Sequence, residues 1–197
     1  MNVCMIIFNY WPGPQGGTEH QCRLLSNALH ERGVTCTVLT SHSTCGLAWR
    51  ENDAGVRIVR MPTLDGLWRR PNEDKGHQVT PATSVRSTKG EGHQPLSAIV
   101  MVYLNTLFFQ IASSMFLWRH RRRFDVLHVH TSEWIAGFAV WIGARLRLPV
   151  VCKVATLPVM RPLDRAIPFR QRLATLRTQC EFMAQNEAQA DDLRATG

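Results

Sequence analysis

Short apolar runs bounded by turn residues alternate with helix-like segments along most of this chain, and this alternation limits its fold more than any other feature. Continuous apolar runs are typical of strands that are buried on both faces of a parallel sheet. The expected strands are Val3–Phe8, Val34–Thr40, Val56–Met61, Asp125–His130, Val150–Val154 and Cys180–Ala184. The expected helices start near Thr18, Leu96, Ser132, Leu163 and Glu187. The order predicts an α/β fold, an open parallel sheet with helices on both faces.

The length and composition favour one domain. The chain has 197 residues, of which 45% are hydrophobic, enough for a single sizeable core. Asp65–Pro95 differs from the rest because it is rich in Gly, Pro, Thr and charged residues and has few apolar anchors. We therefore expect one domain over residues 1–197 with a flexible insert at about 65–95.

The first predicted helix has recognisable ends. Thr18 and Gln21 have the spacing of a capping box, in which a hydroxyl and a glutamine side chain satisfy free backbone amides. Apolar residues then recur at helical spacing, and Gly33 is expected to end the helix in the left-handed conformation.

The positive charge is concentrated in two places. The formal net charge is +8; Arg119, Arg121, Arg122 and Arg123 supply +4, and the basic segment 161–177 supplies another +4. Such patches favour an anionic partner, such as a phosphate group or a membrane surface. The alternative is that both are solvated faces that keep the protein soluble. Nothing in the pattern points to nucleic acid.

One segment is long and apolar enough to cross a membrane. Leu96–Trp118 has 23 residues without a formal charge and is followed by Arg119 and its basic neighbours. Polar residues such as Asn105 and Gln110 interrupt it, and a span here would split the core between two predicted strands. We favour a buried or membrane-surface helix over a transmembrane one.

The cysteines indicate a reducing compartment. The six are scattered without a CxxC pair, so neither a disulfide scaffold nor a zinc site is expected. The first apolar run has no preceding positive charge and does not read as a secretory signal. These features favour the cytoplasm.

Ligands of open parallel sheets gather at the carboxyl ends of the strands, which here are followed by the loops Asn9–Glu19, His128–Ser132 and Lys153–Met160. In the first loop, Gly16 and Gly17 precede a helix whose free amides can attract a phosphate, although a plain tight turn fits equally well. The spacing is neither G-x-G-x-x-G nor a P-loop. Glu19, in the first helical turn, is a further candidate for substrate contact, although its negative charge also suits the helix dipole.

Two further side chains at strand ends are candidates for ligand contact. Alternation places His128 and His130 on one face, where His128 suits the core and His130 suits a polar ligand. No other metal-ligating residue stands nearby at ligand spacing, so a metal site is not expected. Lys153 ends an apolar strand, where it either contacts a phosphate or sugar or extends to solvent.

Five segments in order resemble the N-terminal domain of family-4 type glycosyltransferases of the GT-B fold, which is Rossmann-like. The likeness covers nearly the whole chain outside the insert. The segments are Trp11–Glu19, the helix end Leu29–Gly33 with the strand to Thr40, Phe124–His130, Arg145–Val151 and Ala184–Arg194.

The resemblance implies a function and roles for residues. In that family the N-terminal domain binds the sugar acceptor, a second domain binds the nucleotide-sugar donor, and transfer retains anomeric configuration without a metal or other cofactor. Gly16 and Gly17 would approach the donor phosphates, and His130, the second histidine of the family's His-x-His, would act at the transferred sugar or orient the acceptor. Where many relatives have a histidine, this chain has Ala155 and Thr156, which shifts that contact to Lys153 and Thr156.

The resemblance also implies what is missing. The donor half of the family carries a Glu-x7-Glu pair, and no two glutamates here are eight positions apart. We therefore expect the acceptor-binding half of an enzyme that moves sugar to a glycan or lipid-linked acceptor, inactive without its donor domain, in the cytoplasm or at the inner face of the plasma membrane. The alternatives are one subunit of a two-polypeptide glycosyltransferase, or a non-catalytic membrane-surface or binding module. Polysaccharide biosynthesis is the expected setting.

Overall fold

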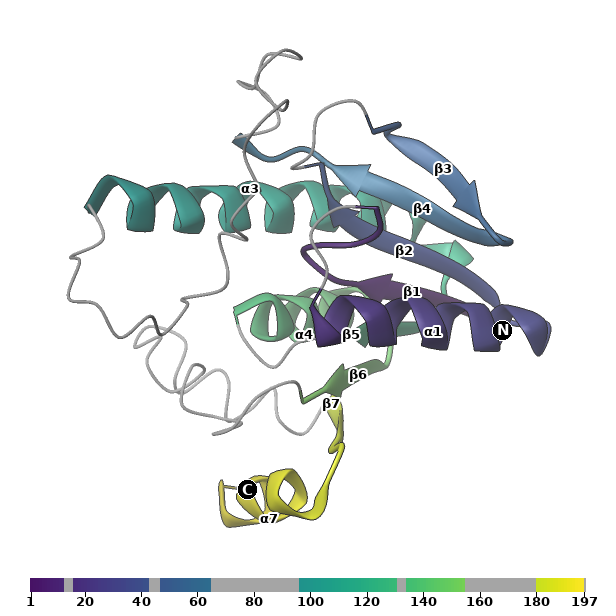
Figure 1. Ribbon diagram of the computed structural model, residues 1–197, viewed down its shortest axis with the longest axis vertical. Helices are drawn as coiled ribbons and strands as arrows, with labels where there is room; N and C mark the ends of the chain where they lie inside the picture. The colour runs from purple at the N-terminus through teal and green to yellow at the C-terminus, as the bar shows by residue number, and fades with distance from the viewer. Residues whose placement is uncertain (13–15, 43–46, 65–95, 131–133, 155–179, 197) are drawn as a thin grey trace.

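The computed structural model describes residues 1–12, 16–42, 47–64, 96–130, 134–154 and 180–196, and it contains a seven-stranded sheet with helices on both faces (Figure 1). The strands are β1 (Asn2–Ile6), β2 (Thr35–Ser41), β3 (Arg50–Asp53), β4 (Val56–Met61), β5 (Val126–Val129), β6 (Val150–Lys153) and β7 (Cys180–Met183). The helices are α1 (Gly17–Glu31), α3 (Leu96–His120), α4 (Trp134–Leu146) and α7 (Glu187–Thr196), with a 3-10 turn η1 (Arg121–Arg123). The predicted flexible insert at 65–95, the predicted helix at Leu163–Thr178, Ser132 and Thr156 lie outside the described residues.

The strand order is β3-β4-β2-β1-β5-β6-β7. All paired strands are parallel except β3, which is antiparallel to β4. The chain first builds outward from β1 through β2 to β4, and then returns through α3 to place β5 on the other side of β1. The predicted α/β fold, a Rossmann-like open sheet, is confirmed.

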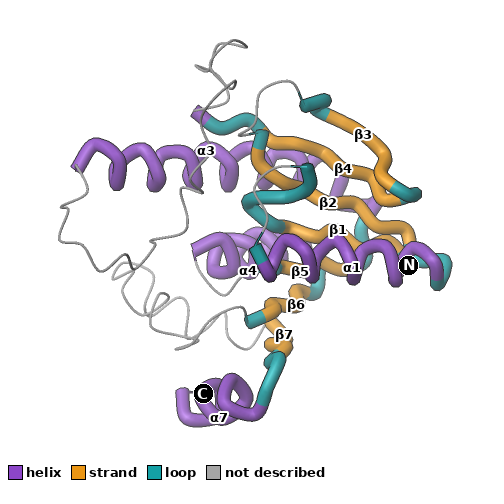
Figure 2. Tube along the Cα trace, viewed as in Figure 1, coloured by secondary structure: helices purple, strands orange, loops and turns teal. Residues whose placement is uncertain are grey.

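Period-two alternation along each strand divides the core into two layers. Val3, Met5 and Ile7 pack with Cys22 and Leu25 of α1 on one face. The other face holds a second cluster, in which residues of α3 and α4 cover alternate strand positions; its strand members include Cys4, Ile6, Leu39, Val59, Leu127 and Val129. Figures 1 and 2 show α1 in front of the sheet and α3 and α4 behind it. Both faces are covered, which is why the inner strands β1, β2, β5 and β6 are largely apolar. The edge strand β3 is polar, and β4 contains two arginines.

The helix α1 begins earlier than predicted and is capped by different residues. Gly16 is the N-cap, and its backbone N–H donates to the Glu19 carboxylate at 2.8 Å. The predicted Thr18–Gln21 capping box is wrong, because the Glu19 side chain caps the helix by accepting from the Gly16 N–H and Gln21 bonds to Lys153 instead. The predicted end is confirmed: Gly33 has φ of 79° and its N–H donates to the His30 carbonyl at 2.9 Å.

The short strand β3 was missed by the sequence analysis. It forms a hairpin with β4 through Ala54 and Gly55, which have φ of 51° and 86° and so suit a tight hairpin turn. Asn52 accepts a hydrogen bond from the Gly55 N–H at 2.8 Å. A Cβ at Gly55 would collide with the His30 ring, so the turn also lies directly against the end of α1.

The long apolar helix α3 lies along the sheet, with one side buried and the other exposed. Phe109 and Leu117 have no solvent exposure, and the Phe109 ring packs on Phe8 with centroids 5.3 Å apart. By length and composition the segment Val100–Arg123 could cross a membrane. Its buried side completes the core on that face, however, so removing α3 from the domain would uncover the sheet.

Candidate functional site

The candidate site lies at the carboxyl ends of β1, β5 and β6, where the chain reverses the direction in which it adds strands to the sheet. These three strands are neighbours in the sheet, and β1 and β5 lead to connections on opposite sides. Such a switch point leaves a crevice between the diverging loops, which is where ligands of open α/β sheets bind. The three predicted loops therefore start from adjacent strands.

The N-terminus of α1 is presented at this edge. Gly16 and Gly17 are exposed, and a Cβ at Gly17 would meet no other atom within 4 Å, so the surroundings of Gly17 are open. The Glu19 carboxylate accepts a hydrogen bond from the Gly16 N–H and so caps the helix. This end of α1 thus offers further free amides and a positive dipole end to an anion, while Glu19 has a structural task.

His128 and His130 lie side by side, as the alternation of β5 predicts. Their ring centroids are 4.5 Å apart, and the His128 position pairs with Met5, on the face covered by α1. His130 is completely buried, and within the described part of the chain neither of its ring nitrogens has a hydrogen-bond partner. The Nε2 atom of His128 is also unpartnered there. Buried polar atoms without partners are costly, and a ligand can supply the missing hydrogen bonds.

Lys153 joins the β6 end to α1. Its ammonium group donates a hydrogen bond to Oε1 of Gln21, one turn after Gly17. The Lys153 side chain is largely buried and is directed to this partner; it does not extend freely to solvent. This bond connects Lys153 with α1, and the pairing of β6 with β5 places Lys153 next to the histidine pair.

Burial controls the charge of this region. Burial, with smaller contributions from His128 and Lys153, lowers the pKa of His130 to about 3. Burial and Lys153 likewise lower the pKa of His128 to about 4. Both imidazoles are therefore neutral at pH 7, and each offers one donor and one acceptor. Burial also lowers the pKa of Lys153 from its ordinary value. The region suits hydroxyl groups and an anion.

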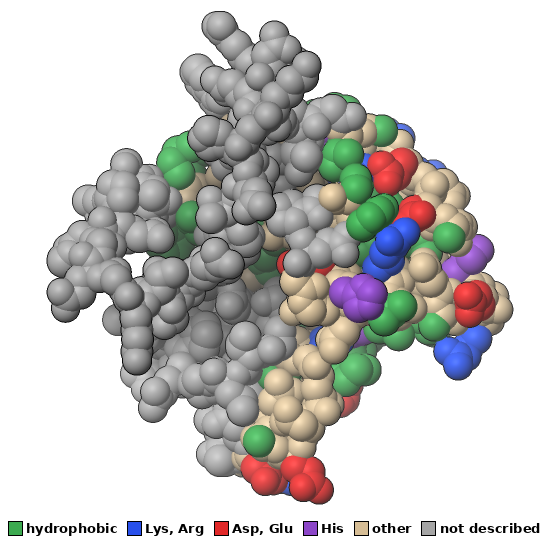
Figure 3. Space-filling view, in the orientation of Figure 1, with side chains coloured by type: hydrophobic (Ala, Val, Ile, Leu, Met, Phe, Trp, Pro, Cys, Tyr) green, Lys and Arg blue, Asp and Glu red, His purple; other side chains and the backbone are tan. Residues whose placement is uncertain are grey.

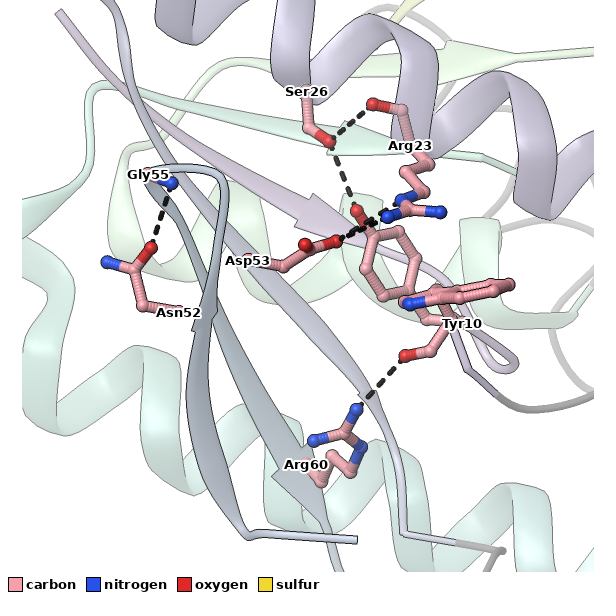
Figure 4. A network of polar contacts seen from close by, with 8 residues as sticks. Tyr10, Arg23, Ser26, Asn52, Asp53, Gly55 and Arg60 are labelled. Atoms are coloured by element: carbon pink, nitrogen blue, oxygen red, sulfur yellow. Dashed lines mark hydrogen bonds and ion pairs between the residues drawn. The ribbon is translucent and has the colours of Figure 1, made fainter.

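A polar network anchors the loop that connects β1 to α1 (Figure 4). The Arg60 guanidinium donates to the Trp11 carbonyl at 3.0 Å and to Glu51 of β3 at 2.7 Å. Arg23 of α1 pairs with Asp53 at 3.1 Å and lies 4.3 Å from the centre of the Trp11 ring. The hairpin of β3 and β4 thus holds the first part of the glycine-containing loop against α1.

The predicted arginine cluster lies away from this region. Arg119 ends α3, and Arg121, Arg122 and Arg123 form η1, shortly before β5 begins. They therefore lie at the amino edge of the sheet, opposite to the carboxyl ends of the strands. All four are exposed. A direct role beside His130 is excluded by this placement, and an anionic partner of the cluster would bind at another surface.

The sequence analysis did not anticipate the parts played by Gln21 and Arg60. Gln21 lies four residues after Gly17, but only the packing of α1 on β1, β2 and β4 brings it within reach of Lys153. The available signal for Arg60 was an arginine inside a predicted strand, because a buried arginine requires partners; β4 holds two, the buried Arg60 and the exposed Arg57. Within the described residues, no group of three His, Cys, Asp or Glu side chains could hold a metal.

Comparison with protein families decides what kind of domain this is. The glycosyl transferase 4-like domain family matches residues 16–197. The chain belongs to this family. The resemblance seen in the sequence is therefore confirmed, and this glycosyltransferase-like domain has its candidate site at the strand ends described above. A comparison with curated protein sequences found no match.

Solved structures of similar proteins include larger glycosyltransferases. Sucrose-phosphate synthase from Thermosynechococcus elongatus is 14% identical with a TM-score of 0.47, and the match covers 93% of this chain and 47% of that protein. UGT89C1 from Arabidopsis thaliana is 14% identical with a TM-score of 0.49, covering 94% and 49%. UGT2 from Phytolacca americana, complexed with UDP-2-fluoro-glucose and pterostilbene, is 11% identical with a TM-score of 0.47, covering 90% and 33%. The chain spans about half or less of their lengths.

Proposed function

We propose that this glycosyl transferase 4-like domain is the acceptor-binding half of a retaining glycosyltransferase that moves a sugar from a nucleotide-sugar donor to a glycan or lipid-linked acceptor. The observation that carries the proposal is the buried His128–His130 pair beside Lys153 at the switch point of a domain of this family. The donor-binding half is supplied by a second domain or by a second polypeptide. No resident cofactor or metal is part of the proposal.

The proposed roles follow from charge and hydrogen-bonding capacity. His130 is neutral at pH 7, so it can accept a proton or hydrogen bond from an acceptor hydroxyl, or donate one to the transferred sugar. Gly16 and Gly17 at the start of α1 and the ammonium group of Lys153 would stabilise negative charge that develops on the leaving phosphate. Thr156, which lies outside the described residues, is kept as a proposed acceptor contact. Since His130 is buried, binding must open its surroundings.

We place the reaction in the cytoplasm. Cys4, Cys22, Cys36 and Cys152 are buried free thiols, and Cys180 is a partly buried one, which suits a reducing compartment. Membrane contact at the inner face of the plasma membrane is a separate proposal, because it depends on a different part of the molecule.

The proposal is tested by measuring sugar transfer with and without a donor-binding domain. We expect the 197-residue chain alone to show no transfer from UDP- or GDP-sugars, and transfer with retained configuration, read by NMR of the product, when it is fused to or mixed with a family donor domain. His130→Ala in the active combination should lower kcat at least about 100-fold, as removing a proton-transfer group does. His20→Ala, at an exposed position of α1, is the matched control.

Three outcomes would contradict this assignment. Turnover by the isolated chain would show that no donor half is needed. Full activity of the His130→Ala combination would remove the proposed catalytic residue, while equal losses in His20→Ala would indicate a general effect of substitution. If no donor domain gives transfer, the chain is a non-catalytic binding module.

A further inference from the structure

The outer side of α3 carries most of the exposed large hydrophobic side chains in the described part of the molecule. Of the fourteen that are exposed, nine belong to α3. The most exposed are Tyr103, Leu107, Ile111, Met115 and Trp118, at 48 to 68% of their full accessible area. Spaced three or four residues apart, they form one stripe along the helix, which we call the α3 outer face. Contiguous exposed apolar surface of this kind marks an interaction site.

The opposite side of α3 is unusually polar for a side that packs on a sheet. Asn105, Gln110 and Ser113 are buried there together with Phe109 and Leu117. An ordinary surface helix has the reverse arrangement, with polar residues toward water. Packing in the domain core therefore does not explain the composition of α3, because most of its large apolar side chains face away from the core, where a binding partner could cover them.

Charge identifies the kind of partner. Residues 96–123 contain no aspartate or glutamate, and Arg119, Arg121, Arg122 and Arg123 stand exposed at the C-terminal end of the helix. Arg123 also lines a cavity of about 300 Å³ together with Arg57, His120, Phe116 and Phe124. A second copy of this helix would bring no acidic residue to these arginines. An anionic lipid surface supplies both an apolar layer and negative headgroups.

We propose that the α3 outer face lies in the interface of an anionic membrane, parallel to its plane, with the arginine cluster on the lipid headgroups. The exposed apolar residues of α3, from Val100 to Trp118, extend over about 27 Å at 1.5 Å per residue. Tyr103 and Trp118, near its two ends, are the residue types that prefer the boundary between headgroups and acyl chains. The helix does not span the membrane, because its inner side stays packed on the sheet.

This inference is independent of the proposed sugar transfer, and vesicle binding tests it without any substrate. The 197-residue chain is mixed with vesicles of phosphatidylcholine alone, or with about one third phosphatidylglycerol, and separated by flotation. We expect binding to the anionic vesicles only, weakened by salt. The double variant Ile111→Glu, Met115→Glu should lower vesicle binding at least about tenfold. In the double variant Arg121→Glu, Arg122→Glu, each charge reversal should lower vesicle binding about fivefold or more.

Matched controls separate the α3 outer face from general hydrophobicity and charge. Leu24→Glu changes an equally exposed apolar residue on α1, and Arg32→Glu reverses an exposed arginine at the far end of α1. Both should bind vesicles as the unchanged chain does. Because all substituted residues are exposed, the circular dichroism melting curves of all variants should coincide. If the variant with Ile111→Glu and Met115→Glu melts at a lower temperature, Leu107→Gln takes its place.

A second measurement locates the helix in the bilayer. Brominated acyl chains should quench part of the tryptophan fluorescence in anionic vesicles, and Trp118→Phe should remove most of that quenching while leaving binding within about twofold. Absence of vesicle binding, or binding unaffected by the α3 substitutions, would overturn the proposal. A dimer in light scattering that the Ile111→Glu, Met115→Glu variant dissociates, without vesicle binding, would assign the face to a second copy instead.

Discussion

Among the described residues, the two longest helices, α1 and α3, cover opposite faces of the same sheet and use their apolar residues in opposite ways. α1 turns Cys22, Leu25 and Leu29 to the sheet and leaves mainly polar and charged residues outside. On the face of the molecule that carries α1, side chains of different kinds are interspersed (Figure 3). α3 buries Asn105, Gln110 and Ser113 and exposes a continuous apolar stripe.

This difference separates two tasks within one fold. α1 belongs to the candidate site, because its N-terminus and Gln21 reach the ends of β1 and β6. α3 closes the core with only part of its apolar surface and has the remainder available for a partner. Burying apolar area against the sheet stabilises the fold, whereas the same area exposed contributes nothing until it is covered.

The largest expected effect compares neighbouring phenylalanines on α3. Phe109 is fully buried, and Phe108 is 38% exposed. Phe109→Ala should lower the free energy of unfolding by about 3–5 kcal/mol, because it leaves a cavity against Phe8, while Phe108→Ala should cost less than about 1 kcal/mol. Urea denaturation measures both. Equal losses would mean that the outer side of α3 is packed in solution.

The next largest effect is the pH dependence of stability caused by the two histidines on the sheet face that α1 covers. The folded pKa values of His128 and His130 lie below the ordinary 6.5. The unfolded chain therefore binds protons first as pH falls through 6.5, and stability present above that pH is lost below it. From pH 7 to 5 we expect a loss of about 3–4 kcal/mol in the free energy of unfolding, measured by urea denaturation. The double variant His128→Phe, His130→Phe should show a flatter profile; parallel profiles would disprove the assignment.

A smaller effect is expected for the contact between α1 and β6. Gln21→Met leaves the Lys153 ammonium without its amide partner and should lower the free energy of unfolding by about 1–2 kcal/mol. Adding Lys153→Met should recover most of that loss, because both polar groups are then removed. A double-mutant cycle from denaturant unfolding measures the coupling. A coupling near zero would show that the two side chains do not interact in solution.

The smallest expected effect tests the cap of α1. Glu19→Gln weakens the contact with the Gly16 amide and removes a negative charge from the positive end of the helix dipole, at a cost of about 0.5 kcal/mol. Glu31→Gln, at the other end of α1, should be neutral or slightly stabilising because a negative charge is unfavourable there. Thermal unfolding of the two variants compares them, and an equal shift in both would contradict the capping role.

Much of the fold could be predicted from the sequence because most of its strands are buried on both faces and consist mainly of apolar and β-branched residues. The run at Val56 matches β4 residue for residue, and the left-handed Gly33 ends α1 as expected. β3 could not be recognised, because an edge strand with one neighbour carries the polar sequence Arg-Glu-Asn-Asp. Its only sequence signal is the turn at Ala54 and Gly55.

The candidate site was predictable in part. That His128 and His130 share a face follows from strand alternation, and their place beside Lys153 follows from the rule for parallel sheets. The partner of Lys153 did not follow, because Gln21 was assigned to a cap that Glu19 forms. The loss of charge on both histidines also depends on burial, which the local sequence does not specify.

Local patterns by themselves determined the order of the strands and helices other than β3, and the strand ends where ligands gather, since these depend on periodicity and turn residues a few positions apart. The family followed from the resemblance of five segments in order. Only the tertiary structure decided which side of α3 faces the sheet and which segments meet at Lys153. Helical periodicity could not choose between the sides of α3, because large apolar residues lie on both of them. That choice depends on which side chains fit the space left by the sheet, and this space is formed by residues far away in the chain.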